Sequence, residues 1–362
     1  MKVRDAQPED NEALVALAAQ CPMVGDLSLC VDRRPEFFAL SRLSGYPWRV
    51  GVIDGDTGPI GCVGVARRAV YLDGRATQLA YIGDLKVRPD HRGRGAGRAL
   101  ARWAMTAARD LVGDDGPLLA TVLAGNTAVD TLRRDLAPTV RRWATVRSHS
   151  ISLLWRRRRP RTGLAVRPAG PADGPAMVAL WRRLSVARQF APILESFPVS
   201  APGPARAERA PWGSAPGPGP DYLLAHGPDG ELVGFIGLWD QHGIKQMRVT
   251  GYSRRLAAAR VGFNLAAPLF RAPRLPPPGG ALRHRTVVNP CASDARTLRT
   301  LLVHAGNRLR GQCSFLTIGL DTRDPLSRAL AGLFAQPTDV DLLVLGPTPR
   351  GTAPAHFEIA TV

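Results

Sequence analysis

Residues Asp84–Arg98 combine a carboxylate, glycines and arginines in an order that suits the binding of a phosphorylated ligand. An apolar stretch ends at Val87, and the amphipathic pattern of a helix begins at Gly97. The loop supplies three glycines, three arginines and an alanine: Gly93, Gly95, Gly97, Arg92, Arg94, Arg98 and Ala96. Glycines let the backbone turn sharply, so that several N–H groups can approach a pyrophosphate at the positive end of a helix dipole. We therefore predict an anion-binding loop, to which the arginines add charge.

The same glycines could suggest a dinucleotide fingerprint, but three features argue against it. The first glycine of that fingerprint is missing, and no parallel βαβ unit opens the domain. In addition, no acidic residue is placed to hold a ribose. The loop is therefore interpreted as a site for a different phosphorylated cofactor.

The elements that must position this loop lie on both sides of it. We expect strands at Ala66–Leu72 and Thr77–Val87 before the loop, and a helix with one apolar face at Gly97–Leu111 after it. The rest of the first half is expected as a strand, a helix and a closing strand, at Leu118–Leu123, Thr127–Arg134 and Thr145–Trp155. This order predicts a mixed α/β fold.

An internal repeat indicates two copies of one fold. Val3–Leu17 recurs as Val166–Leu180, with nine of fifteen positions identical at a constant offset of 163. A hairpin pattern at Arg49–Val65 likewise has a counterpart at Tyr222–Gly237. The length of 362 residues suits two domains. We place the domains at residues 1–157 and 164–362, with the arginine-rich stretch between them as a linker.

The loop also carries a family resemblance. The pattern Val87-x-Pro89-x-x-Arg92-x-x-Gly95-x-Gly97 resembles the acyl-CoA loop of the GNAT superfamily of N-acetyltransferases. Asn126-Thr127-Ala128 is similar to the Asn-x-x-Ala element of that family, with one residue fewer. The resemblance implies an α/β fold of two tandem GNAT-like domains, each with a mixed, mostly antiparallel central sheet flanked by helices. It also implies acetyl-CoA or another acyl-CoA as co-substrate, with no metal.

The resemblance further implies roles for individual residues. Leu85, Lys86 and Val87 would present backbone groups to the pantetheine arm, on a strand that splays from its neighbour. The loop from Arg92 to Arg98 would hold the pyrophosphate. Asn126 would lie near the thioester.

Acylation of an amine needs a base, because only the neutral amine attacks the thioester. Asp84, on the strand before the loop, is the carboxylate best placed for this role, and Tyr81 on the same strand is a weaker polar candidate. The tyrosine that the family often uses to protonate the thiolate is missing, and no tyrosine lies between Tyr81 and Tyr222. Water, Tyr222 or Tyr252 could serve as the acid, or catalysis could proceed without one.

The second copy lacks the glycine loop. Aligning Val288-Asn289-Pro290 with Val87-Arg88-Pro89 puts Cys291–Arg296 at the loop position, and side chains there would obstruct a phosphate. We therefore expect one cofactor site, with the second half completing the substrate cleft, docking an acceptor or stabilising the first half. Two insertions are also expected in this half: a loop at Phe197–Pro220, and Arg254–Gly280 with a helix at Leu256–Phe270.

The composition limits the classes of binding partner to be considered. The net charge of +18 comes from 45 arginines and only three lysines, a bias that a GC-rich genome could also produce. A basic surface suits the phosphates of coenzyme A, an acidic carrier protein or peptide, or nucleic acid. Nucleic acid is disfavoured because no recognition motif accompanies the charge. Five scattered cysteines and no apolar run of membrane-spanning length favour a cytoplasmic protein without disulfides, zinc or a membrane span.

The leading hypothesis is an N-acyltransferase that moves an acyl group, acetyl or longer, from acyl-CoA to a primary amine of a small molecule or peptide. One alternative is a carrier-protein-dependent or long-chain transfer to a peptide. Another is a non-catalytic module that senses acyl-CoA or binds a partner.

Overall fold

The computed structural model describes residues 1–136, 140–199 and 219–361. The first half contains, in chain order, β1 (Arg4–Asp5), α1 (Asn11–Ala19), β2 (Leu27–Asp32), α2 (Phe38–Ser44), β3 (Trp48–Gly55), β4 (Gly58–Leu72), β5 (Arg75–Val87), α3 (Ala96–Val112), β6 (Leu118–Leu123), α4 (Thr127–Leu136) and β7 (Arg141–Ser152). The second half contains β8 (Ala165–Pro168), α5 (Gly174–Ser185), β9 (Asp221–His226), β10 (Leu232–Trp239), β11 (Gln246–Tyr252), α6 (Arg254–Ala266), β12 (His284–Ala292), α7 (Ala295–Leu309), β13 (Phe315–Asp321), β14 (Ala335–Leu345) and a short 3-10 helix, η6 (Ile359–Thr361).

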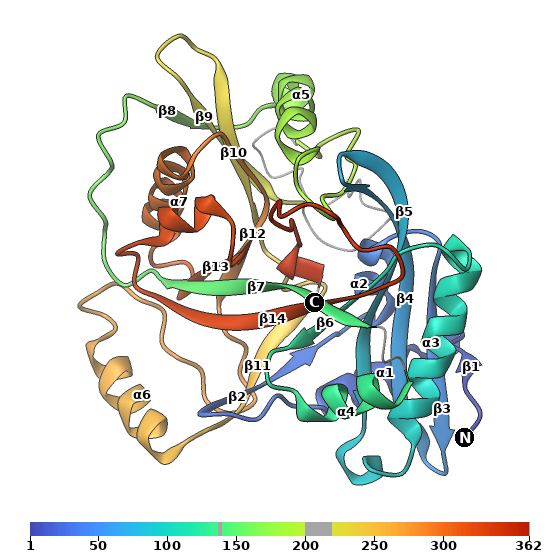
Figure 1. Ribbon diagram of the computed structural model, residues 1–362. Helices are drawn as coiled ribbons and strands as arrows, with labels where there is room; N and C mark the ends of the chain where they lie inside the picture. The colour runs from blue at the N-terminus through green and yellow to red at the C-terminus, as the bar shows by residue number, and fades with distance from the viewer. Residues whose placement is uncertain (137–139, 200–218, 362) are drawn as a thin grey trace.

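One mixed sheet, mostly antiparallel, runs through both halves. Its twelve strands follow the order β1-β3-β4-β5-β6-β14-β7-β13-β12-β10-β9-β8. The two halves therefore exchange their last strands: β14 lies between β6 and β7, and β7 pairs with β13 (Figure 1). The predicted α/β class, with helices flanking mostly antiparallel strands, is confirmed.

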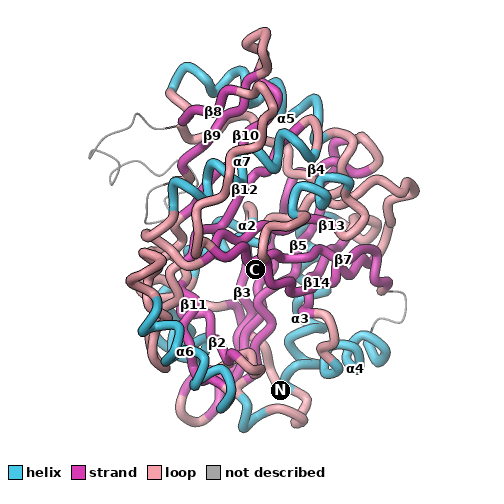
Figure 2. The backbone as a smooth tube through the Cα atoms, turned by 90° about the vertical axis from the view of Figure 1, so that its left-hand side faces the viewer, coloured by secondary structure: helices cyan, strands magenta, loops and turns pink. Residues whose placement is uncertain are grey.

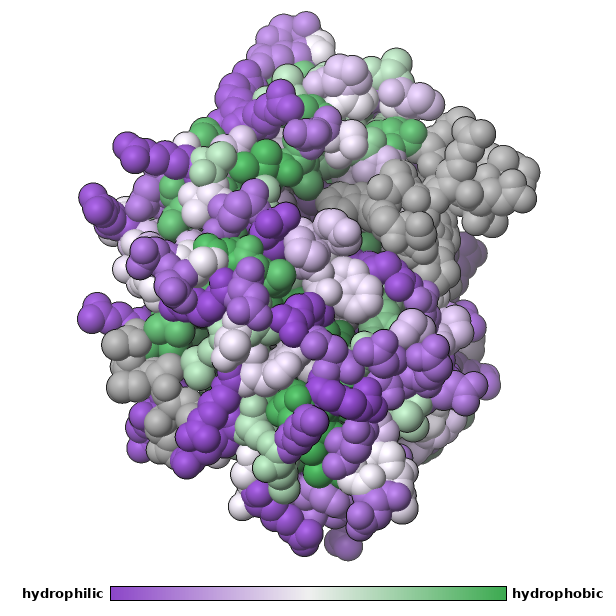
Figure 3. All heavy atoms as spheres, turned by 90° about the vertical axis from the view of Figure 1, so that its right-hand side faces the viewer, coloured by the Kyte–Doolittle hydropathy of each residue, from purple (hydrophilic) through white to green (hydrophobic). Residues whose placement is uncertain are grey.

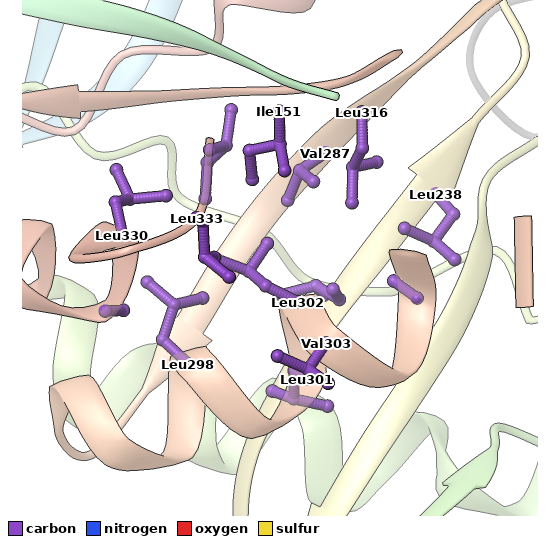
Figure 4. Close-up of a cluster of buried hydrophobic side chains, with 14 of the residues drawn as sticks. Ile151, Leu238, Val287, Leu298, Leu301, Leu302, Val303, Leu316, Leu330 and Leu333 are labelled. Carbon is purple, nitrogen blue, oxygen red and sulfur yellow. The ribbon is translucent and has the colours of Figure 1, made fainter. Parts of the chain in front are cut away.

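The exchange extends into the cores. Ile151 of β7 packs among side chains of the second half, under α7 (Figure 4). In the other direction, Leu342 and Val344 of β14 pack against Leu79 and Leu119 of the first half. Each half thus buries apolar residues that the other half supplies, and burial of such side chains is the main favourable term in folding. The division at residues 1–157 and 164–362 stays a prediction.

A second, two-stranded sheet also joins the halves. β2 of the first half pairs with β11 of the second in antiparallel register, from Leu27↔Tyr252 to Asp32↔Gln246. The two strands lie side by side in the view of Figure 2, next to α6. Nothing in the sequence pattern indicated this pairing.

The expected helix after the loop is confirmed as α3, whose buried face holds Leu100, Ala104 and Ala107. The expected hairpins form β3–β4 and β9–β10. The expected insertion at Arg254–Gly280 is longer than predicted, because residues 240–283 connect β10 to β12 where only Asp73-Gly74 connects β4 to β5. Most of the expected loop at Phe197–Pro220 lies outside the described residues. None of the described helices combines the length and hydropathy needed to cross a bilayer.

Candidate active site

β5 and β6 diverge at the predicted site. These parallel strands pair at only three positions, from Ala80↔Leu118 to Ile82↔Ala120. β5 nevertheless continues to Val87 and β6 to Leu123. The backbone groups of β5 that face β6 beyond Ile82 therefore have no ladder partner on that strand, so a ligand could hydrogen-bond to them. Leu85, Lys86 and Val87 lie along this opening, as the sequence predicts.

The loop after β5 leads into the start of α3. Gly93 (φ 74°) and Gly95 (φ 89°) adopt the left-handed conformation that glycine favours, and Gly95 is the residue before α3. A Cβ added at either glycine would meet open space, with no heavy atom within 4 Å. The first N–H groups of α3 have no partner within the helix and carry the positive end of its dipole. The geometry suits an anion seated against exposed backbone.

The predicted arginines surround this helix end. Arg92, Arg94 and Arg98 are exposed, whereas Ala96 is buried under the sheet. Arg92 Nε donates a hydrogen bond to the Val87 carbonyl oxygen at 3.2 Å. Arg92 thus also ties the loop to the end of β5.

Asp84 lies in a β-bulge of β5. The register with β4 runs from Gly64↔Gly83 to Cys62↔Lys86, so two residues of β5 face Val63 alone, and Asp84 has a φ of 60°. Strict alternation would turn Asp84 to the face of Ile82, which packs under α3. The bulge instead turns its carboxylate into a pocket on the other face of the sheet.

This pocket opens between α2 and strands β4 and β5. It encloses about 310 Å³ of empty space, including its open mouth. Its polar lining comes from both ends of the chain: Arg33, Ser41, Ser44, Tyr81, Asp84 and Thr361. The C-terminal segment therefore contributes to the wall beside the bulge.

Two cations hold the Asp84 carboxylate. Arg33 Nη1 donates to Asp84 Oδ2 at 2.6 Å, and Lys86 Nζ donates to Oδ1. Arg33 is buried, with 1% of its side chain exposed, and its Nη2 donates to the Phe37 carbonyl oxygen. Both carboxylate oxygens carry charge-assisted hydrogen bonds, which fix the position of the carboxylate and leave lone pairs on each oxygen.

Burial favours the neutral form of the nearby lysines. Loss of solvent lowers the pKa of Lys86 to about 8. It also lowers the pKa of Lys245 to about 7, with a further contribution from the positive charges of Arg33 and Lys86. Lys245 comes from the second half and donates to the Ile359 carbonyl oxygen at 3.4 Å. The second half thus adds a titratable group close to the bulge.

Sequence reasoning missed Arg33, Lys245 and Thr361. Arg33 lies 51 positions from Asp84, and Lys245 and Thr361 belong to the other half. One signal was available: Lys86 and Lys245 are two of only three lysines in a chain that otherwise uses arginine.

The three tyrosines considered for catalysis, Tyr81, Tyr222 and Tyr252, each have a hydrogen-bond partner. The Tyr81 hydroxyl lies 2.8 Å from Thr121 Oγ1 of β6, just where the strands begin to part, and burial raises the pKa of Tyr81. Tyr222 donates to Asn289 Oδ1 at 2.9 Å inside the second half, and Tyr252 donates to the Pro276 carbonyl oxygen at 2.7 Å. Neither second-half tyrosine hydrogen-bonds to Asp84.

Asn126 lies where the sequence places it, after β6. It is exposed, and its Oδ1 accepts a hydrogen bond from the Val129 N–H at 3.3 Å at the start of α4. This is the contact of a helix cap. The side-chain amide of Asn126 can still donate to a ligand, so its role toward a thioester stays a prediction.

The second half repeats the bulge but lacks the loop. Its register runs from Gly237↔Val288 to Phe235↔Cys291, which makes Asn289 (φ 47°) the counterpart of Asp84. The sequence alignment of Val288 with Val87 is therefore wrong: Gly61 pairs with Val87, and its counterpart Gly234 pairs with Ala292. Only Ser293 and Asp294 separate β12 from α7.

The missing loop is thus deleted, rather than replaced by Cys291–Arg296. Asp294 caps α7, because its Oδ1 accepts from the Thr297 N–H at 2.7 Å. A carboxylate at this helix end repels phosphate and occupies the N–H groups that an anion would use.

The C-terminal segment fills the second opening. β12 and β13 pair only from His284↔Phe315 to Thr286↔Thr317 and then diverge. Glu358 Oε1 accepts from the Asn289 N–H at 2.9 Å, and a Cβ added at Gly319 of β13 would lie 2.4 Å from Ile359. The chain itself therefore occupies the opening that is free in the first half.

Comparisons with known proteins agree with this geometry. Residues 12–133 match the family model of the Acetyltransferase (GNAT) family. This part of the chain is therefore similar to the GNAT family. A search of curated proteins finds no match.

The GNAT-like fold extends over the whole chain. N-myristoyltransferase of Saccharomyces cerevisiae, solved with bound myristoyl-CoA, has a TM-score of 0.61 at 11% identity, covering 96% of this chain and 83% of its own. A GCN5-related N-acetyltransferase from Sphaerobacter thermophilus has a TM-score of 0.54 at 15% identity, with 97% and 98% covered. A GCN5-related N-acetyltransferase from Anabaena variabilis has a TM-score of 0.53 at 13% sequence identity, covering 95% of this chain and 72% of its own. At these identities the likeness concerns the fold alone, and that fold resembles the tandem arrangement of the myristoyltransferase.

Proposed function

We propose that the protein is an N-acyltransferase that moves an acyl group from acyl-CoA to a primary amine of a small molecule or peptide. The observation that carries the proposal is the opening between β5 and β6, which lies beside a glycine loop with open space around it at the start of α3. In this proposal Leu85–Val87 hold the pantetheine arm, Arg92–Arg98 hold the pyrophosphate, and Asn126 lies near the thioester. The match of residues 12–133 to the GNAT family supports acyl-CoA as the donor.

The reaction follows from the positions around the bulge. The neutral amine attacks the thioester carbonyl, the C–N bond forms, and the thiolate of coenzyme A leaves and takes up a proton. N–H groups of β5 beyond Ile82 can stabilise the charge that develops on the carbonyl oxygen. Asp84 is the proposed acceptor of the amine proton, and Arg33 and Lys86 fix its position. Water is the proposed donor to the thiolate, because Tyr222 and Tyr252 have other partners.

A short acyl group is favoured. Tyr81 fills the space below the point where the strands part, with Phe357 at 5.8 Å between ring centroids and the Arg68 guanidinium 4.0 Å from its ring. A long chain would have to displace this buried cluster, at a cost in packing. The myristoyl-CoA held by the yeast neighbour makes chain length a necessary part of the test.

The test is thiol release from acetyl-, octanoyl- and myristoyl-CoA over a panel of small amines and peptides. We expect turnover with acetyl-CoA and at least one amine, and little with myristoyl-CoA. Myristoyl transfer without acetyl transfer would contradict the short-chain assignment. Tight binding of acyl-CoA without turnover on any amine would contradict catalysis and favour a sensor of acyl-CoA.

A further inference from the structure

Helix α6 carries several of its apolar side chains on the outside. None of its residues, Arg254–Ala266, is buried. Leu265 is 78% exposed and Leu269, just after the helix, is 83% exposed, with Val261 and Phe270 also exposed. We call these four residues, Val261, Leu265, Leu269 and Phe270, the α6 stripe. An isolated helix of this length is marginal in water and would normally turn such side chains to a core.

The helix is nevertheless held firmly on its inner side. Ser253 caps it, with its Oγ accepting from the Leu256 N–H, and the Ser253 N–H donates to the Asp26 carbonyl oxygen at 2.8 Å. Asn264 exchanges two hydrogen bonds with the backbone of Leu275. The fold therefore presents the stripe outward in a fixed position. The helix lies next to β2 and β11 and away from the twelve-stranded sheet (Figures 1 and 2).

The segment that carries the stripe is rich in basic residues. Residues 241–293 contain one lysine and eight arginines and no Asp or Glu. Exposed arginines lie at both ends of the stripe, at Arg254 and Arg255 before it and at Arg271 and Arg274 after it. A second copy of the chain would therefore bring arginines against arginines, which disfavours self-association through this surface.

A second exposed apolar pair is tied to the end of the stripe. Arg310 links the two regions, because its Nη2 donates to the Phe270 carbonyl oxygen at 3.0 Å and its Nε to that of Leu154 at 3.2 Å. The next residue, Trp155, is exposed and contacts exposed Phe334 at 6.2 Å between ring centroids. On the opposite face of the molecule, hydrophilic side chains are spread over most of the coloured surface, with smaller hydrophobic areas between them (Figure 3).

We propose that this surface binds the anionic face of a lipid membrane. Leucine, phenylalanine and tryptophan side chains on a protruding surface can enter the headgroup region, while the flanking arginines pair with lipid phosphates. The segment that carries α6 lies between β10 and β12 and has no counterpart between β4 and β5, where two residues suffice. Within this segment β11 pairs with β2, but α6 itself buries no residue, so its exposed face can serve an interaction.

The test is co-sedimentation of the full chain with phosphatidylcholine vesicles, with and without about 30% phosphatidylglycerol. We expect binding to the anionic vesicles roughly tenfold stronger than to the neutral ones, and weakened by salt. The double variant Leu265→Ser/Leu269→Ser should lose most of this binding, as should Arg254→Gln/Arg255→Gln. Tyr46→Ser, an exposed apolar control, and Arg102→Gln/Arg182→Gln, a matched charge control on α3 and α5, should bind like the wild type.

Thermal unfolding of each variant checks that it is folded. Equal binding to both kinds of vesicle, or no binding to either, would overturn the proposal. So would unchanged binding of the stripe variants. Association of an acidic protein through Leu265 and Leu269, without vesicle binding, would assign the surface to a protein partner instead.

Discussion

Asp84 and Asn289 occupy the same β-bulge in the two halves of the sheet. Both have left-handed backbone, with φ of 60° and 47°, and both lie where a parallel strand begins to part from its neighbour. Their surroundings differ. Asp84 faces a pocket and forms ion pairs with Arg33 and Lys86. The backbone N–H of Asn289 donates a hydrogen bond to Glu358, and its side-chain oxygen accepts one from Tyr222. The comparison indicates one strand opening with a pocket beside it and one strand opening filled by the chain.

Asp84→Asn should separate charge from shape at the bulge. Asparagine tolerates left-handed backbone, so the bulge should persist. We expect acyl-CoA affinity to change by less than about twofold, because the N–H groups of the loop are untouched. Turnover should fall by about 100-fold or more if the carboxylate takes the amine proton. Binding is measured by calorimetry and turnover by thiol release, and full activity would remove Asp84 from the mechanism.

The same substitution should also reduce stability. Arg33 would keep a buried charge without its carboxylate, which we expect to cost about 1–3 kcal/mol in the free energy of unfolding. Thr361→Ala alters the same pocket without changing its charge and serves as the control. It should lower the free energy of unfolding by less than Asp84→Asn does. An Asp84→Asn variant as stable as the wild type in urea would contradict the ion pair.

Lys245 should make stability depend on pH. Its pKa in the folded chain is about 7, against 10.5 for an ordinary lysine. Between these values the unfolded chain binds more protons than the folded one, so this residue's contribution to stability rises with pH. Replacing it removes a penalty that is complete below about pH 7. The gain in Tm of Lys245→Met over the wild type should therefore be larger at about pH 6 than at about pH 9.

Lys2→Met is the matched control, because Lys2 is exposed and should give no such difference. A gain for Lys245→Met that is equal at both pH values would show that Lys245 titrates normally in the folded chain.

The strand exchange predicts that the first half does not fold alone. A fragment of residues 1–157 lacks β14, which pairs with both β6 and β7. It also lacks β13, so one edge of β6, both edges of β7 and the apolar residues that Leu342 and Val344 cover would be exposed. We expect this fragment to aggregate, and to be rescued by co-expression with residues 158–362. A soluble monomeric fragment that unfolds cooperatively would contradict this prediction.

The sequence indicates local structure and the first site well, for physical reasons. The periodic apolar face of α3 and the glycines before it are local features, and both lie where predicted. The repeat revealed the second copy. The pairing of Arg33 with Asp84 and of β2 with β11 depends on contacts far apart in the chain, which no local pattern encodes. The misalignment at Val288 arose because Val288-Asn289-Pro290 resembles Val87-Arg88-Pro89 in sequence, whereas strand pairing, which no local pattern encodes, makes Ala292 the counterpart of Val87.

Asp294→Ala tests the view that the second half carries no anion site. Loss of the cap should destabilise α7 by about 1 kcal/mol, seen in urea unfolding. Acyl-CoA affinity should not change, because the cofactor is assigned to the other half. A second binding event that appears in this variant would show that only Asp294 blocks a latent site.

The most direct test of the central claim is calorimetric titration of the full chain with acetyl-CoA, comparing wild type, Gly95→Val and Gly113→Val. Both glycines have positive φ and open space around them, and they flank the two ends of α3. Gly95→Val should strain a left-handed backbone by about 1–2 kcal/mol. Gly113→Val should strain the backbone at least as much, because a φ of 80° with a ψ of 169° is a conformation that essentially only glycine adopts. We predict one acetyl-CoA per wild-type chain, at least tenfold weaker binding in Gly95→Val and unchanged binding in Gly113→Val. Two sites per chain, or equal affinity in the two variants, would contradict the assignment of the cofactor to the β5–α3 loop.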